Sequence, residues 1–466
     1  MKNISIFNQV IGPVMRGPSS SHTAGAFFIA RIARSLLGDM VKRVEVTFDP
    51  DGSYARTYHE QAADLAFVCG IIDIELTDER FFDVFDIARR AGVEIKFAVK
   101  KLEQANHPNT MDIKMVSEKG QRLSLRAIST GGGSVEIVRL EGWEVDFNGT
   151  FYEIAIEAEA ESGPVITRLL RQSEDLVEEP SLKVKESLVL VSTRSRSPFG
   201  QGVLSKLEKM PGFRRKWLVE PVCPVVKKQP LFQSAQQMIK LAQKQSVSLG
   251  QLALEYESEI LGLPRKEILV EADRRFRIMQ SSVGQGLELE AERIQFLKPS
   301  AGKILRLEKE GRLPIGGSYL RAGARALAVM HINGKCGVVC AAPTGGSAGT
   351  LPGVLVTLLE DERIGHEKIL LSLLAAGAIG AIVAQRATFA AEIAGCQVEI
   401  GAAGAMAAAA VVEAFGGNAG QAADAAAIAF QNIMGSVCDL VQGKVEIPCH
   451  TRNALGAANA FLCAGL

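Results

Sequence analysis

The sequence predicts a chain of three parts. These are an α+β N-terminal domain over residues 1–150, a small βαββαβ module over residues 151–225 and a mainly α-helical C-terminal domain over residues 226–466. Two observations predict this division. Strand-like and helix-like patterns alternate in the first two parts. After Gln229, strand signals almost disappear, and alanine-rich helices that are apolar on nearly every face follow one another.

The N-terminal part alternates strands and helices. Apolar and polar residues alternate over 43–47 and 93–97, which predicts strands, and a helical period is found over 78–92. A further helix is predicted over 24–37, after a run of Ser and Thr residues. We therefore expect an α+β domain here.

The middle part has a different order of elements. The pattern predicts a strand over 152–157, a helix over 165–172, two strands within 182–193, a helix over 202–210 and a strand over 216–219. This βαββαβ order is typical of a small ferredoxin-like module.

In the C-terminal part, the alanine-rich pattern predicts helices over 404–415 and 419–434, with Gly416, Gly417 and Asn418 between them. Its most apolar run, residues 369–384, is shorter than the roughly 20 residues that a bilayer requires. We therefore expect a buried helix within a bundle. The polar interruptions of these helices then become the places where chemistry is expected.

Charge and composition restrict the function. The chain has 52 basic and 52 acidic residues, a balance that gives no support for nucleic-acid binding. We expect a small-molecule partner and no membrane partner. No secretory signal is predicted at the N-terminus. The eight cysteines show no short-range disulfide pattern, which fits a reducing compartment, and we expect a cytoplasmic protein.

Three cysteines, Cys396, Cys438 and Cys449, follow the spacing C-x41-C-x10-C, and each lies beside glycine, proline or a polar residue. A cubane iron-sulfur cluster that is held by three thiolates leaves one iron free to bind a substrate and act as a Lewis acid. The plainer interpretation is that these cysteines are ordinary buried residues, because free cysteine is among the most buried residue types.

The run Gly17-Pro18-Ser19-Ser20-Ser21-His22-Thr23 precedes the first long helix of the N-terminal part. Such residues commonly cap a helix, and this is the plainer interpretation. The functional interpretation adds anion binding, because hydroxyls, backbone N–H groups and the positive end of a helix dipole together can hold a carboxylate. His22 would then carry a proton.

Two glycine-rich loops and one arginine complete the candidate residues. Residues 129–134 lie between predicted strands, where a structural turn is the alternative to a binding loop. Residues 343–349 lead into a helix, where small residues leave N–H groups open to an anion. Arg452, just after Cys449, could bind a substrate carboxylate with two hydrogen bonds or form an exposed ion pair.

Taken together, these segments resemble the iron-sulfur-dependent L-serine dehydratases (L-serine ammonia-lyases) over nearly the whole chain. The middle module resembles an ACT regulatory domain, which implies a homodimer or a higher oligomer. The matching motifs are residues 17–23 and 131–133 of a β-type domain and, in an α-type catalytic domain, residues 342–344, 395–397, 438–439, 446–449 and 452–454.

The resemblance implies that L-serine, or a close β-substituted amino acid, is converted to pyruvate and ammonia by β-elimination without pyridoxal phosphate. It implies a [4Fe-4S] cluster on Cys396, Cys438 and Cys449, with Cys463 as a possible fourth ligand, and His22 as the acid/base group. The residues implied to bind the substrate are Ser19, Ser20, Ser21, Thr23, Ser129, Thr130, Gly131, Gly132, Ser134, Thr344, Arg452 and Asn453.

The chain departs from the family pattern at Gln61, at Leu440 after Asp439 and around residues 298–302. Where members usually have the histidine of a Gly-His-Gly-Thr-Asp stretch, this chain has Gln61, whose amide does not titrate. The second hypothesis is therefore a diverged amino-acid-binding or regulatory homologue without dehydratase activity. The third is a purely structural or redox-sensing cluster.

Overall fold

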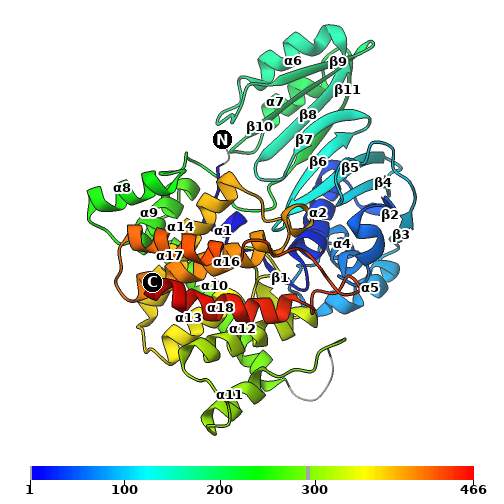
Figure 1. The fold of residues 1–466 in the computed structure, drawn as a ribbon. Coiled ribbons are helices and arrows are strands. Elements are labelled where there is room, and N and C mark those ends of the chain that lie inside the picture. The colour runs from blue at the N-terminus through cyan, green and yellow to red at the C-terminus, as the bar shows by residue number, and fades with distance from the viewer. Residues whose placement is uncertain (1–2, 290–293) are drawn as a thin grey trace.

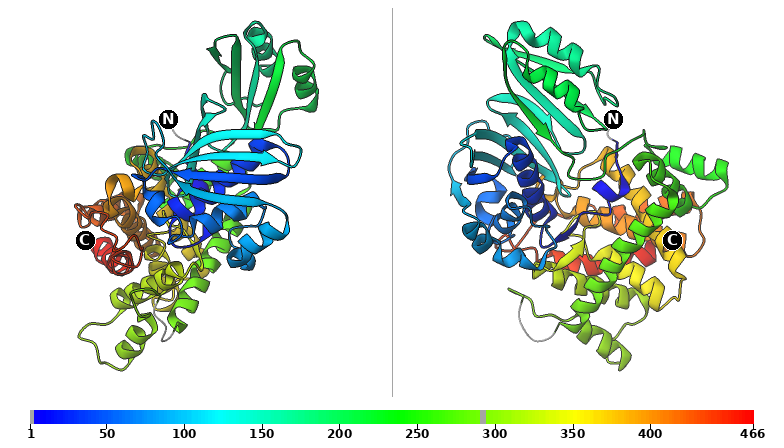
Figure 2. Two further views of the ribbon diagram at one scale, coloured as in Figure 1. Left: turned by 90° about the vertical axis from the view of Figure 1, so that its right-hand side faces the viewer. Right: turned by 180° about the vertical axis from the view of Figure 1, so that it is seen from behind.

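The computed structural model describes residues 3–289 and 294–466. Its elements form three regions: a six-stranded sheet with helices, a four-stranded sheet with two helices, and a helical region that holds most of the second half of the chain (Figure 1). Figure 2 shows the four-stranded sheet at one end of the molecule. The mixed first half and the helical second half confirm the predicted content of the two halves.

The six-stranded sheet has the order β3-β2-β4-β5-β6-β7, and all its pairs are antiparallel except β2–β3. Helices α2 (Gly25–Leu37) and α4 (Ala63–Ile71) share one apolar core with it. Between β2 and β3 the chain also forms α3 (Ser53–Thr57), η2 (Glu79–Asp83) and α5 (Val84–Arg90). The strands are β2 (Val41–Phe48), β3 (Glu94–Val99), β4 (Thr110–Ser117), β5 (Arg122–Gly131), β6 (Ser134–Leu140) and β7 (Trp143–Phe147).

The second sheet, β11-β8-β10-β9, is antiparallel and has a core on each face. In β8, Ile154 and Ile156 pack with the module's own helices, whereas Ala155 faces the core of the first sheet. The predicted βαββαβ order is confirmed. Its elements are β8 (Tyr152–Glu159), η3 (Ala160–Ser162), α6 (Gly163–Leu170), β9 (Ser181–Lys185), β10 (Leu188–Ser195), α7 (Gln201–Glu208) and β11 (Phe213–Val219).

The helical region contains a single short strand among its described residues, β12 (Val338–Cys340). The helix predicted over 404–415 in fact begins eight residues earlier, at Cys396. The helices are α8 (Ala235–Gln245), α9 (Leu249–Leu261), α10 (Arg265–Glu288), α11 (Ala301–Lys309), α12 (Ser318–Gly334), α13 (Thr350–Glu360), α14 (His366–Arg386), α15 (Ala391–Ala394), α16 (Cys396–Ala414), α17 (Ala419–Gln431) and α18 (Cys449–Gly465).

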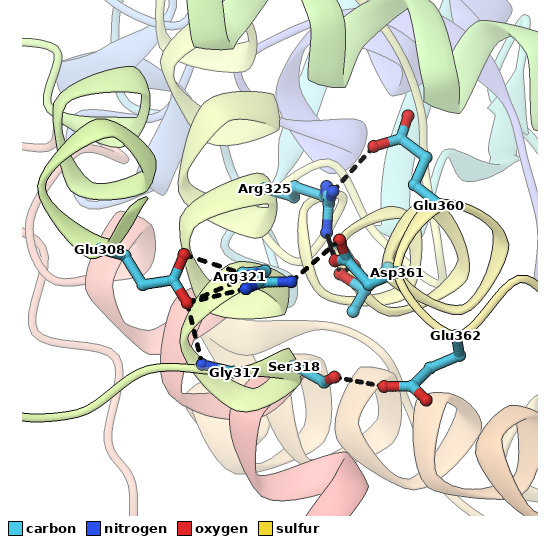
Figure 3. A network of polar contacts seen from close by, with 10 residues as sticks. Glu308, Gly317, Ser318, Arg321, Arg325, Glu360, Asp361 and Glu362 are labelled. Atoms are coloured by element: carbon cyan, nitrogen blue, oxygen red, sulfur yellow. Dashed lines mark hydrogen bonds and ion pairs between the residues drawn. The ribbon is translucent and has the colours of Figure 1, made fainter. Parts of the chain in front are cut away.

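A network of ion pairs joins α11, α12 and the end of α13 (Figure 3). Arg321 of α12 pairs with Glu308 of α11 and, at 3.3 Å, with Asp361. Arg325, one turn further along α12, pairs with Asp361 and with Glu360. Two arginines four residues apart thus connect three helices on one side of the helical region.

The run predicted as a buried core helix lies within α14. Two described helices, α14 and α16, have the length and apolar composition of a membrane span. However, 72% of the apolar stretch of α14 and 83% of that of α16 are buried inside the protein. The expectation of a buried core helix over 369–384 is therefore confirmed by its burial.

The first residues of the chain are part of the C-terminal core. Ile6, Val10 and Ile11, in and after α1 (Ile6–Gln9), belong to the same apolar cluster as α10 and α14. Residues 4–15 thus extend out of the predicted N-terminal domain and insert between helices of the other half.

Two buried charged residues hold this inserted segment. Glu257 of α9 accepts hydrogen bonds from Ser5 Oγ, Ile6 N and Phe7 N at the start of α1. Arg275 of α10 donates to the carbonyls of Phe7 and Ile11 at its other end. Burial raises the pKa of Glu257, while the hydrogen bonds from Ser5, Phe7 and Ile6 act in the opposite direction.

We expect Glu257→Ala to lower the free energy of unfolding by about 2–4 kcal/mol, because it leaves buried donors of α1 without an acceptor. Chemical denaturation measures this. The matched control is Glu259→Ala on the same helix, whose carboxylate is 43% exposed and pairs with Lys228; it should cost less than about 1 kcal/mol. Equal losses in the two variants would show that Glu257 does not anchor the segment.

Candidate active site

The site is assembled by a short antiparallel pairing between β1 (Val14–Arg16) and β12, with Val14 opposite Cys340 and Arg16 opposite Val338. This pairing brings residues 17–23 against residues 341–349. At Gly345 an added Cβ would lie 2.9 Å from Ser20 N, so only glycine allows the two loops to approach this closely.

The Ser-Ser-Ser-His-Thr run forms a π-helix turn, η1 (Ser20–Ala24), that leads directly into α2, with Ser19 as its N-cap. His22 is 2% exposed. Its Nδ1 lies 3.1 Å from Ser21 Oγ, and its Nε2 lies 2.9 Å from Ser53 Oγ of α3. Because a hydroxyl lies at hydrogen-bond distance from each ring nitrogen, the imidazole has a fixed orientation.

Three predicted thiols come together in the helical region. Cys396 and Cys449 are the first residues of α16 and α18, and Cys438 lies in the loop before α18. The pKa of Cys396 is lowered to about 6, because the Cys449 thiol and then the Arg452 guanidinium donate to its sulfur. The pKa of Cys449 is raised well above its ordinary value by the same contact and by burial.

A cavity of about 470 Å³ joins the two halves. The segment before α18 reaches from the helical region to the N-terminal domain (Figure 1), where Gln61 Nε2 donates to Gly443 O at 2.9 Å. The lining residues are Pro18, Ser19, Ser21, His22, Ser53, Arg56, Thr57, Gln61, Gly346, Ala391, Glu399, Cys438, Leu440, Gln442, Gly443, Val445 and Cys449.

Comparisons with known proteins identify this architecture. A sequence model of the serine dehydratase alpha chain matches residues 225–466. The chain is 34% identical over 236 residues to the probable L-serine dehydratase, alpha chain, of Bacillus subtilis. The aligned residues make up 51% of this chain and 79% of that protein. The chain belongs to the serine dehydratase family.

Two further relatives account for the N-terminal half. The probable L-serine dehydratase, beta chain, of B. subtilis is 44% identical over 156 residues, or 34% of this chain and 69% of that protein. The L-serine dehydratase of Haemophilus influenzae is 25% identical over 473 residues, 98% of this chain and 89% of that protein. This serine dehydratase chain therefore combines beta-type and alpha-type regions in one polypeptide.

The structure places Ser19, Ser21 and His22 in one cavity with Cys438 and Cys449. Other residues that were predicted to bind the substrate lie behind the residues that line this cavity. Thr23 Oγ1 donates to Gln61 O, and Ser20 is buried outside the lining. Thr344 donates to Glu399 Oε1 at 2.7 Å and so contacts the cavity through that carboxylate.

The hairpin between β5 and β6 does not line the cavity, contrary to the prediction for Ser129, Thr130, Gly131, Gly132 and Ser134. Ser129 is fully buried, and Ser134 is exposed. The glycines instead approach the segment before α15: a Cβ at Gly131, whose φ is +102°, would meet Ala390 at 2.9 Å. The loop therefore acts as a contact between domains, because its glycines permit close approach of two backbones.

Arg452 and Asn453, which do not line the cavity, have partners within the protein. Arg452 pairs with Asp439 at 2.7 Å and donates to Val437 O. Asn453 is fully buried, accepts from the N–H groups of Gly349 and Thr350 and donates to Cys449 O. These two residues fix the Cys438 loop and join α18 to the start of α13.

Cys463 does not reach the other three thiols. It lies fourteen residues beyond Cys449 in the same helix, a rise of about 21 Å. Its sulfur accepts a hydrogen bond from Asn432 of the segment after α17. The possible fourth ligand is therefore corrected to a buried helix-packing residue.

Sequence reasoning missed four polar lining residues that lie on helices: Ser53, Arg56 and Thr57 on α3, and Glu399 on α16. Glu399 lies three residues after Cys396, a spacing that places both on one side of a helix start and could have indicated it. His59, close to Gln61 in the sequence, is 78% exposed and pairs with Asp64, so it does not replace the missing histidine in the cavity.

In metal-free reduced protein, we expect the ultraviolet absorbance of one thiolate to rise around pH 6, in agreement with the lowered pKa of Cys396. Arg452→Gln should move this midpoint upward, because it removes a positive donor from the thiolate. Cys396→Ser should abolish the transition. The control Cys69→Ser should retain it, because burial raises the pKa of that thiol to about 12. A transition that persists in Cys396→Ser would contradict the assignment.

Proposed function

We propose that this member of the serine dehydratase family converts L-serine, or a close β-substituted amino acid, to pyruvate and ammonia. One observation carries the proposal: a single cavity brings His22 and the serine hydroxyls of one domain to the cysteines of the other. The names of the relatives, which include L-serine dehydratases, support the substrate class.

We propose that Cys396, Cys438 and Cys449 hold a [4Fe-4S] cluster. The donor set fits such a cluster, because Cys438 and Cys449 line one cavity, Cys396 contacts Cys449 and the pKa of Cys396 is lowered. In the described part of the chain, no group of His, Cys, Asp or Glu has the spacing of a single-ion site. A cubane is larger than an ion and takes thiolates that stand further apart. When bound, it would supply a Lewis acid for the departing hydroxyl.

The chain's own residues would bind the substrate and transfer the proton. The Ser19 and Ser21 hydroxyls would donate to the substrate carboxylate, and His22 would receive the α-proton. Loss of that proton and of hydroxide leaves an enamine, which tautomerises to an imine, and water releases pyruvate and ammonia. Gln61 cannot act as an acid or base, so His22 is the imidazole available in this cavity among its described lining residues.

A second candidate function is ligand binding without turnover. The observation that favours it is Gln61, which stands at the position of the histidine in the family pattern. Its side chain is 3% exposed, and its amide donates to Gly443 O. The βαββαβ module would then be an ACT-like regulatory unit that pairs between copies of the chain in the cytoplasm. Binding of L-serine to cluster-loaded protein with no release of ammonia would favour this alternative.

Anaerobically purified protein should show the brown colour of a cluster and release pyruvate from L-serine. Cys438→Ala should lose both, because the cluster would keep only two thiolates. The matched control is Cys463→Ala, a buried cysteine away from the site, which should retain iron content and activity. Colourless, iron-free wild-type protein from an anaerobic preparation would exclude the proposal.

His22→Asn should lower kcat by about 10²- to 10⁴-fold, the usual contribution of a positioned acid or base. The fold should be retained, because asparagine can still bond to the neighbouring hydroxyls. His59→Asn, which changes a histidine outside the cavity, is the control and should remain within a few-fold of wild type. Steady-state pyruvate formation and thermal melting measure both; a normal kcat in His22→Asn would assign the proton transfer to another group.

A further inference from the structure

One face of α3 forms part of the cavity wall. Ser53, Arg56 and Thr57 all line the cavity, and their i, i+3, i+4 spacing places them on the same side of the helix. Ser53 contacts His22 Nε2. Arg56, whose side chain is exposed, therefore belongs to the same cavity wall as His22.

The charge of Arg56 has no partner within residues 3–289 and 294–466, since no described side chain or carbonyl forms a hydrogen bond or ion pair with its guanidinium. It is also the one Lys or Arg among the described lining residues. Arg452, by contrast, is occupied by Asp439 and Val437 O. The cationic group that is available to a ligand thus comes from the N-terminal domain.

The other half of the chain contributes the opposite charge. Glu399 of α16 lines the same cavity. A ligand with a carboxylate and an ammonium group, as in an α-amino acid, would find one complementary charge on each domain. An arginine fork is well suited to the carboxylate, because its parallel N–H groups match two carboxylate oxygens.

We propose that Arg56 binds the α-carboxylate of the amino-acid substrate and selects ligands that carry this group. This inference rests on the proposed function and assigns to Arg56 the role that the sequence had suggested for Arg452. The Ser53 hydroxyl on the same helix face would join the Ser19 and Ser21 hydroxyls as donors around the carboxylate, whereas the Thr57 hydroxyl donates to Ser53 O.

The experiment compares L-serine with L-serinamide, which lacks the carboxylate charge, on cluster-loaded anaerobic protein. Arg56→Gln should raise both the Kd from calorimetry and the KM for L-serine by about 10- to 100-fold, with kcat within a few-fold. Its Kd for L-serinamide should equal that of wild type. Arg56→Lys, which keeps the charge but not the fork, should recover part of the loss.

The control is Arg122→Gln, an exposed arginine at the start of β5 outside the cavity. Equal L-serine affinities in Arg56→Gln and Arg122→Gln, or an equal loss for serine and serinamide in Arg56→Gln, would overturn the proposal. If wild type binds L-serine without releasing pyruvate and Arg56→Gln still weakens that binding, the dehydratase function fails while the role of Arg56 stands.

Discussion

The pairing of β1 with β12 is the constraint on which the rest of the site depends. Three residue pairs join the first strand of the chain to a strand in its helical half. Asn333 Nδ2 and Pro18 O, 315 residues apart in sequence, are 2.9 Å apart as a result. Glu257 and Arg275 hold the residues just before β1 inside the helical core. The His22 loop therefore has a fixed position relative to the cysteines, which a flexible contact between two domains would not give.

The cavity built in this way has distinct chemistry on its two sides. The N-terminal side presents hydroxyls, an imidazole and a guanidinium, whereas the C-terminal side presents thiols and a carboxylate. Cys396 and Cys449 both begin long helices, where the helix dipole favours a thiolate. The lowered pKa of Cys396 agrees with this effect, whereas its contact with Cys396 and burial raise the pKa of Cys449, and Arg452 holds the Cys438 loop in place.

Much of the fold and part of the site could be predicted from the sequence. Periodicity predicted α2, the order of the βαββαβ module and the buried α14, because local patterns determine these elements. The cysteine spacing and the Ser-Ser-Ser-His-Thr run indicated the two sides of the cavity. Arg56 was missed because nothing local distinguishes a lining charge from a solvated one, and Glu399 was missed although its spacing from Cys396 could have indicated it. Arg452 and the 129–134 loop were assigned to the substrate because their partners, Asp439 and Ala390, are visible only after folding.

We propose that an amino acid binds in this cavity beside a metal centre with an open coordination position. The most direct test is the Mössbauer spectrum of anaerobic, iron-enriched protein before and after saturation with L-serine, with saturation established by calorimetry. We expect the signal of one iron site of the cluster to change while the remaining sites keep theirs. An unchanged spectrum at full occupancy would contradict the account, because the bound amino acid would then not contact the cluster.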